Sequence, residues 1–154
     1  MEHFKHYEGA NLENILKAAE LIETIPQEEF DMRTCRAGQK YTDKCDSVGC
    51  IVGHCTVLAP ELISRDIGGE IDFCNFTLAF FGFNWPSDDW LYLFAPSWID
   101  TDNTPKGSAQ RMRYYVANGL PINAIDQKNG KAPLSYNNNK IKIIWKQIKQ
   151  LKLR

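Results

Sequence analysis

The side chains best suited to chemistry lie between positions 45 and 55, which read C-D-S-V-G-C-I-V-G-H-C. Cys50 and His54 are four residues apart, a spacing that places two side chains on one face of a helix. The pair could share a zinc ion with neighbouring cysteines, or form a thiolate nucleophile with its base. However, the intervals lack the paired short clamps of structural zinc sites, and a cysteine inside a helix usually behaves as a small apolar residue. The segment therefore favours buried thiols and a core histidine, with no metal and no other cofactor; a zinc- or thiol-dependent enzyme is the alternative.

The same segment is predicted to contain the start of a helix, with Asp46 or Ser47 as its N-cap. Gly49 and Gly53 would share a face of this helix. A glycine inside a helix costs about 0.5–1 kcal/mol relative to alanine, so two of them indicate close contact with another element or with a ligand. Packing is the commoner explanation. The ligand hypothesis rests on the free N–H groups of a helix start, which attract phosphate. Its candidate binding residues here are Ser47, Val48, Gly49 and His54.

A second group of candidate ligand contacts lies on a helix predicted to begin at Pro105, with Thr104 as its cap and Gly119 beyond its end. Arginine binds phosphate or carboxylate in a two-point manner, and a tyrosine can stack on a base or present its hydroxyl. The ordinary alternative is surface arginines beside half-buried tyrosines. The candidate ligand-binding residues on this helix are Arg111, Tyr114 and Tyr115.

Four short motifs follow one another along the chain: F-D-M at 30–32, C-D-S-V-G-C-I-V-G-H at 45–54, L-F-A-P at 93–96, and A-Q-R-M-R-Y-Y-V-A-N-G at 109–119. In this order they resemble a largely uncharacterised family of small bacterial and phage proteins, over roughly residues 28–120. Ser47 stands where that family usually has threonine. The resemblance implies no catalytic residue. It implies a phage protein of the host cytoplasm that acts in counter-defence, either by occupying a host protein or by sequestering a nucleotide signal.

Length and composition predict one domain over residues 1–154, with 44% hydrophobic and 12% aromatic residues. No apolar run approaches the roughly 20 residues needed to cross a membrane, so no membrane association is expected. The N-terminus lacks the apolar core of a signal peptide. Five cysteines is an odd number, which favours free thiols in a reducing cytoplasm.

The net charge of −1 conceals a strong asymmetry. Residues 1–104 contain 7 Lys/Arg against 18 Asp/Glu, whereas residues 105–154 contain 11 Lys/Arg against one Asp. Much of the basic charge lies in a predicted amphipathic helix at 140–152. This helix could expose a solvated lysine face, bind a partner, or lie against the acidic part of its own chain. Nucleic acid is an unlikely partner, because no aromatic side chain interrupts the lysines of the polar face.

The remaining pattern predicts a mainly α fold, a single compact domain of about six short helices with long connecting loops. Asn11 caps the first helix, Asn75 is the expected cap of a helix ending near Gly82, and Ser87 caps the next. Trp85, Trp90 and Trp98 are expected in the core, and the alternative is that they line a pocket.

Together these features favour a non-enzymatic binding protein that holds a small phosphate-bearing, nucleotide-like ligand. The ligand would lie between the helix start at 47–49 and Arg111, with Tyr114 or Tyr115 stacked on it. The alternative is an inhibitor or adaptor that binds a host protein. The sequence does not determine the oligomeric state, and a homodimer is compatible with it.

Overall fold

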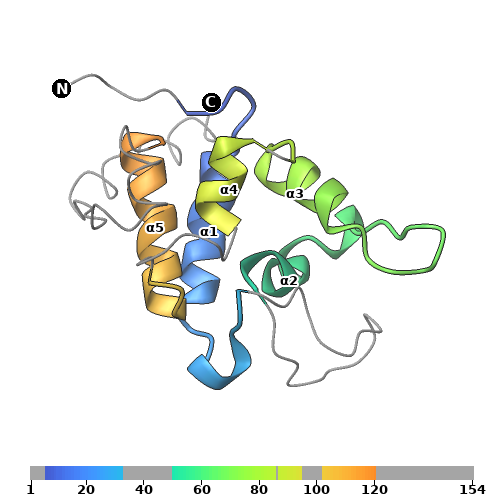
Figure 1. Cartoon of the computed structure of the whole chain (residues 1–154), viewed down its shortest axis with the longest axis horizontal. Helices are drawn as coiled ribbons and strands as arrows, with labels where there is room; N and C mark the ends of the chain where they lie inside the picture. The colour runs from blue at the N-terminus through green and yellow to red at the C-terminus, as the bar shows by residue number, and fades with distance from the viewer. Residues whose placement is uncertain (1–5, 33–49, 86, 95–101, 121–154) are drawn as a thin grey trace, which may run out of the picture.

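The computed structural model describes residues 6–32, 50–85, 87–94 and 102–120, and within these ranges the protein is mainly helical, as predicted. Three 3₁₀ turns, at Gln27–Glu29, Thr56–Leu58 and Pro60–Leu62, accompany the α-helices. The predicted helix at 140–152 lies outside the described residues. The five α-helices of the described ranges are α1 (Leu12–Ile22), α2 (Ile51–Cys55), α3 (Phe73–Phe81), α4 (Asp88–Phe94) and α5 (Pro105–Asn118) (Figure 1).

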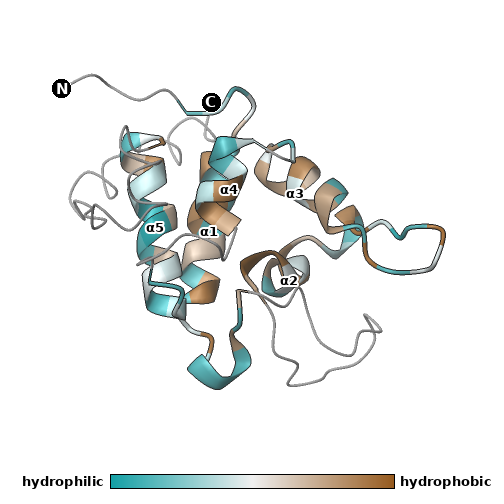
Figure 2. Ribbon diagram, in the orientation of Figure 1, coloured by the Kyte–Doolittle hydropathy of each residue, from teal (hydrophilic) through white to brown (hydrophobic). Residues whose placement is uncertain are grey.

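The main helix–helix interface joins α1 and α5, which lie side by side although they are far apart in sequence (Figure 1). Helices α2 and α3 pack on α1 and on each other, and α4 packs on α5. Apolar side chains of α1 recur at three- and four-residue steps, which brings them to one face; Figure 2 shows these apolar positions along the helix. Leu12 of the α1 stripe is partly buried. The other apolar residues on the inward faces of the two helices are buried: Ile15, Leu16, Ala19, Ile22, Ala109, Met112 and Val116.

Side-chain caps begin three of the helices where the sequence predicts them. Asn11 Oδ1 accepts from the N–H of Asn14 at 3.0 Å, and Thr104 Oγ1 accepts from that of Gly107 at 3.1 Å. Ser87 Oγ accepts from the N–H of Trp90 at 3.2 Å. Each bond satisfies an N–H group that has no acceptor within its own helix, so the local sequence alone defines these starts.

Two predicted helix starts are wrong. Helix α2 begins at Ile51 with Cys50 as its N-cap, later than the predicted start, and 3₁₀ turns follow it. Helix α3 begins three residues before the predicted position, because Asp72 rather than Asn75 is the cap. Asp72 Oδ1 accepts from the N–H of Asn75 at 2.9 Å, while the amide group of Asn75 donates to Asp72 Oδ2. Aspartate and asparagine are about equally good caps, so the sequence did not distinguish them.

The end of α3 is held against the start of α1 by two glycines. Gly82 closes α3 in the left-handed conformation, with φ of 81°. A Cβ atom on Gly82 would lie 1.9 Å from the carbonyl oxygen of Gly9. One residue before Gly82, the carbonyl of Phe81 accepts from the N–H of Asn11 at 2.8 Å. The absence of a side chain at position 82 is therefore a condition for this junction.

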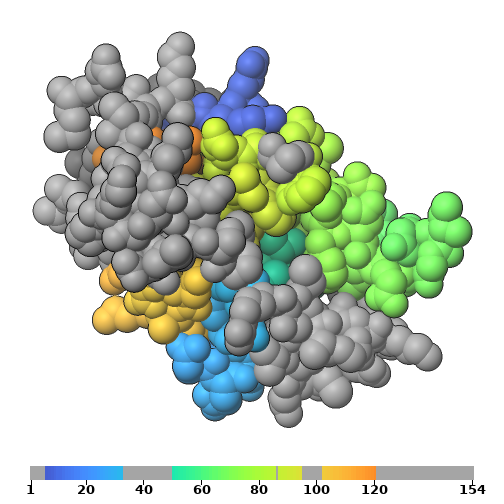
Figure 3. Space-filling view, viewed as in Figure 1, coloured from blue at the N-terminus to red at the C-terminus, as the bar shows by residue number. Residues whose placement is uncertain are grey.

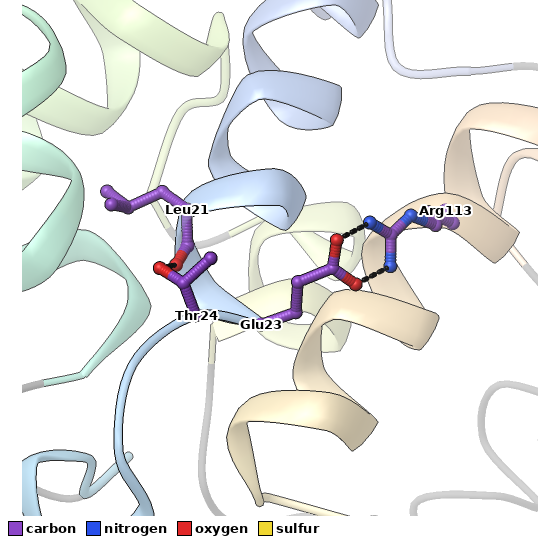
Figure 4. A network of polar contacts seen from close by, with 4 residues as sticks. All are labelled: Leu21, Glu23, Thr24 and Arg113. Atoms are coloured by element: carbon purple, nitrogen blue, oxygen red, sulfur yellow. Dashed lines mark hydrogen bonds and ion pairs between the residues drawn. The ribbon is translucent and has the colours of Figure 1, made fainter.

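A two-point ion pair links the end of α1 to α5 at the surface (Figure 4). Both guanidinium nitrogens Nη1 and Nη2 of Arg113 donate to the carboxylate of Glu23, at 2.6 and 2.5 Å. At the same turn, Thr24 Oγ1 donates to the carbonyl of Leu21. The Glu23 side chain is 42% exposed, so solvent and salt screen the pair.

The variant Glu23→Gln is expected to lower the free energy of unfolding by about 1 kcal/mol or less, and the loss should shrink in high salt. Chemical denaturation at low and at high salt measures this. Glu13→Gln is the matched control, because Glu13 pairs with Lys17 within one helix at 2.8 Å and such pairs contribute roughly 0.3–0.5 kcal/mol. A loss of several kcal/mol for Glu23→Gln would show that the pair is not screened in this way.

In the described ranges, no helix is both long enough and apolar enough to cross a membrane.

Candidate functional site

Arg111 is the most unusual residue of the described structure, because its side chain is completely buried. It extends from α5 toward the end of α4, where Nη2 donates to the carbonyl of Leu93 at 3.4 Å. Nη1 donates to Oδ1 of Asn103 at 3.2 Å. The expectation that Arg111 lies at the surface, as the ordinary alternative to ligand binding, is wrong.

The positive charge of Arg111 has no counter-charge in direct contact among the described residues. Within the described ranges its acceptors are a carbonyl and an amide oxygen, both neutral, and Nε is buried without a hydrogen-bond partner. Burial lowers the pKa of Arg111 to about 10, an effect partly opposed by Tyr92 and by the charge of Asp102. A buried cation that meets only neutral oxygens can bind an anion strongly, because the surrounding dielectric is low.

The loop before α5 places Asn103 against Arg111. Asp102 Oδ1 accepts from both the N–H and the hydroxyl of Thr104, at 2.9 and 2.5 Å. Asp102 also lies directly against Gly107 of α5, where a Cβ atom would be 2.4 Å from the Asp102 carbonyl oxygen. Gly107 is therefore needed for the loop to pack on the first turn of α5. A glycine inside a predicted helix was the available signal, but sequence analysis did not identify it.

Of the two candidate tyrosines, only Tyr114 has an exposed portion. Tyr115 is completely buried, and its hydroxyl donates to Asp89 Oδ1 at 2.6 Å while it accepts from the N–H of Tyr7 at 3.0 Å. Burial, and then the bond to Asp89, raise the pKa of Tyr115. Tyr115 thus joins α4, α5 and the N-terminal segment, while Tyr114 is the tyrosine that stays partly exposed.

His54 and the F-D-M motif form part of the core. His54 Nε2 donates to the carbonyl of Glu29 at 2.8 Å, and the imidazole stacks on Phe30 with ring centroids 6.1 Å apart. Phe30 and Met32 are both buried. These contacts join two of the motifs recognised in the sequence and give them a structural role. Ser47, Val48 and Gly49 lie outside the described residues.

The described cysteines of α2 are core residues. Cys50 and Cys55 are 6% and 0% exposed, and burial raises the pKa of the Cys55 thiol, which keeps it protonated at neutral pH. Among the described residues, no group of three or more histidine, cysteine and acidic side chains could hold a metal ion. Cys35 and Cys45, which the zinc alternative also requires, lie outside those residues.

The structure brings Arg111 together with the L-F motif, because the carbonyl of Leu93 is one of its two acceptors. Neither described acceptor of Arg111 comes from α2. Comparison with models of known protein families, with curated proteins and with solved structures found no match to this chain. The family resemblance therefore stays a prediction.

Proposed function

We propose that this protein is a non-enzymatic binding protein, and that Arg111 is the anion-binding group for a small phosphate-bearing ligand. The observation that supports the proposal is a completely buried guanidinium with two neutral acceptors and an unpartnered Nε. Guanidinium matches the geometry of phosphate oxygens in a two-point manner, and a buried site strengthens the bond. An incoming phosphate would place a counter-charge in direct contact with the guanidinium, where the described residues supply only neutral acceptors.

Tyr114 supports a nucleotide-like ligand rather than a bare ion. Arg111 and Tyr114 are three residues apart on α5, a spacing that makes their side chains neighbours on the helix. Tyr114 is the partly exposed member of this pair, and an aromatic ring can stack on a base. The resemblance to phage proteins adds a context: sequestration of a nucleotide signal would serve counter-defence.

Entry of the ligand requires a movement of the loop Asp102–Thr104. In the described structure Nη1 of Arg111 donates a hydrogen bond to the uncharged amide oxygen of Asn103 at 3.2 Å. A phosphate oxygen forms a shorter and roughly twofold stronger bond to guanidinium than a neutral oxygen does. The ligand would therefore displace Asn103 and accept the hydrogen bond from Nη1 that Asn103 now accepts.

Isothermal titration tests the proposal with adenosine monophosphate and inorganic phosphate as probes. We expect binding to the wild-type protein and a loss of roughly 10- to 100-fold in affinity for Arg111→Met, as for the removal of a charged hydrogen bond. Arg113→Met is the matched control, because Arg113 is on the same helix and pairs with Glu23. Equal affinity of wild type and Arg111→Met, or no binding to either, would exclude this site.

The stability of Arg111→Met provides a separate prediction that needs no ligand. A fall in pKa from 12.5 to about 10 corresponds to a cost on the order of 3 kcal/mol for the buried charge, which the variant removes. The variant also loses two hydrogen bonds, each contributing about 1 kcal/mol. We therefore expect the free energy of unfolding at pH 7 to change by roughly 1 kcal/mol or less. Met112→Ala, a buried apolar truncation on the same helix, should lose about 2–5 kcal/mol.

The pH dependence of the same pair of proteins follows from the lowered pKa of Arg111. Between about pH 10 and 12.5 the unfolded wild type retains a proton on Arg111 that the folded protein has released. The free energy of unfolding of the wild type therefore rises relative to that of Arg111→Met as the pH rises through 10. Below pH 10 the difference between the two free energies is constant. Denaturation at pH 8 and at pH 11 measures this difference. If the variant became the more stable protein relative to the wild type at pH 11, a lowered pKa of Arg111 would be contradicted.

A further inference from the structure

An exposed apolar surface lies where α3 and α4 meet. It is formed by Cys74 and Leu78 of α3, Trp85 of the connecting loop and Trp90 of α4, and is called the α3–α4 surface. Leu78 is 46% and Trp85 56% exposed. Sequence analysis placed Trp85 in the core, and this prediction is wrong. In Figure 3 the two helices form adjoining parts of the surface facing the viewer.

Trp90 connects the exposed Trp85 to α3. Its indole Nε1 donates to Thr77 Oγ1 of α3 at 3.2 Å, and its ring lies edge-on to that of Trp85, with centroids 6.3 Å apart. Cys74 and Leu78 are four residues apart on α3, on the flank next to Thr77. The exposed side chains therefore form one patch rather than scattered residues, and such patches mark binding surfaces.

The chain around this patch is acidic. Residues 56–94 contain six acidic residues and a single basic one, Arg65. Asp88 is exposed in the first turn of α4, next to the patch, and Asp72 caps the start of α3. A second copy of this surface would place acid against acid. The charge instead fits a basic, amphipathic segment.

We propose that the last segment of this chain, residues 140–154, covers the α3–α4 surface. The segment contains six basic residues and no acidic one. Its apolar residues Ile141, Ile144, Trp145 and Ile148 recur at the three- and four-residue steps of a helix face. Apolar side chains would cover Leu78 and Trp85, and the flanking lysines would approach Asp72 and Asp88. This assignment also explains why the acidic and basic charges are separated along the chain.

The connecting residues are long enough for this arrangement. The described chain ends at Leu120. Residues 121–139 can span at most roughly 65 Å when extended. A folded chain of this length has a diameter of about 40 Å. Residues 140–154 can therefore reach any part of the described surface from the end of α5.

Photo-cross-linking in the full-length protein tests the proposal. The photoreactive residue p-benzoylphenylalanine replaces Leu78, which is exposed and can be changed without opening the core. After irradiation, mass spectrometry of the digested monomer is expected to find Leu78→p-benzoylphenylalanine joined to a peptide from 140–154. The matched control carries the same residue at Glu20, exposed on α1, and should give no such product.

Charge reversal in the tail distinguishes this contact from chance proximity. Adding Lys146→Glu and Lys149→Glu should reduce the cross-linked product at position 78 several-fold, and so should about 1 M salt, where the screening length is about 3 Å. Circular dichroism confirms that the variants remain folded. A cross-link to another segment, a cross-link between two chains, or no cross-link in the folded protein would overturn the proposal.

Discussion

Gly82→Ala is expected to lower the free energy of unfolding by about 3 kcal/mol or more. An alanine in the left-handed conformation costs about 1–2 kcal/mol. The new Cβ atom would in addition meet the carbonyl oxygen of Gly9 at 1.9 Å, and this neighbour is backbone, which cannot rotate away. Relief requires α3 and the start of α1 to separate, and this would weaken the bond from Asn11 to Phe81. Urea denaturation measures the loss.

Gly69→Ala is the matched control for this prediction. Gly69 has a φ of 84°, close to the 81° of Gly82, but a Cβ atom there would have no neighbour within 4 Å. Gly69→Ala should therefore lower the free energy of unfolding only by the cost of the left-handed backbone conformation, about 1–2 kcal/mol. The difference between the two variants isolates the contact between α3 and α1. Equal losses would mean that the two chain segments move apart without resistance.

Tyr115→Phe is expected to lower the free energy of unfolding by about 2 kcal/mol. The substitution keeps the ring in the core and removes only a hydroxyl that donates to the buried Asp89 carboxylate and accepts from the N–H of Tyr7. A hydrogen bond to a charged group contributes about 1.5–3 kcal/mol, and both partners would be left in a largely buried environment. For a chain of this size the melting temperature should fall by roughly 4–8 °C.

The control for this prediction is the adjacent Tyr114→Phe. Tyr114 is partly exposed, and its hydroxyl forms no hydrogen bond within the described residues, so a change below about 0.5 kcal/mol is expected. Scanning calorimetry of both variants provides the comparison. If Tyr115→Phe were as stable as the wild type, the hydroxyl would not link α4, α5 and the N-terminal segment as the structure indicates.

The motifs in the sequence have a physical explanation that does not require a ligand. Phe30 stacks on His54, and the carbonyl of Leu93 accepts from Arg111, so the four motifs are joined in two pairs. Residues that look functional because of their unusual types can be retained for such contacts. Arg111 differs from the others, since burial of an unpaired charge weakens the fold unless an anion neutralises it.

The sequence by itself determined which segments are helical. Asn11, Ser87 and Thr104 each cap a helix through a bond that spans three residues, and Gly119 stops α5 with φ of 75°. Such signals are local, because the donor, the acceptor and the required backbone angle lie within one turn. The apolar stripes of α1 and α5 are similarly visible in the sequence, since a period of 3.6 residues defines one face.

Tertiary structure alone decided what each candidate side chain contacts. A surface position was the alternative to ligand binding for Arg111, but the packing of α4 on α5 buries its side chain. Trp85 was expected in the core, but the turn before α4 leaves it exposed. Tyr114 and Tyr115 are adjacent in the chain and differ in burial because they face different sides of one helix. Burial and hydrogen-bond partners depend on residues distant in sequence, such as Tyr7 and Asp89, which both bond to the hydroxyl of Tyr115. A local sequence pattern does not predict such long-range contacts.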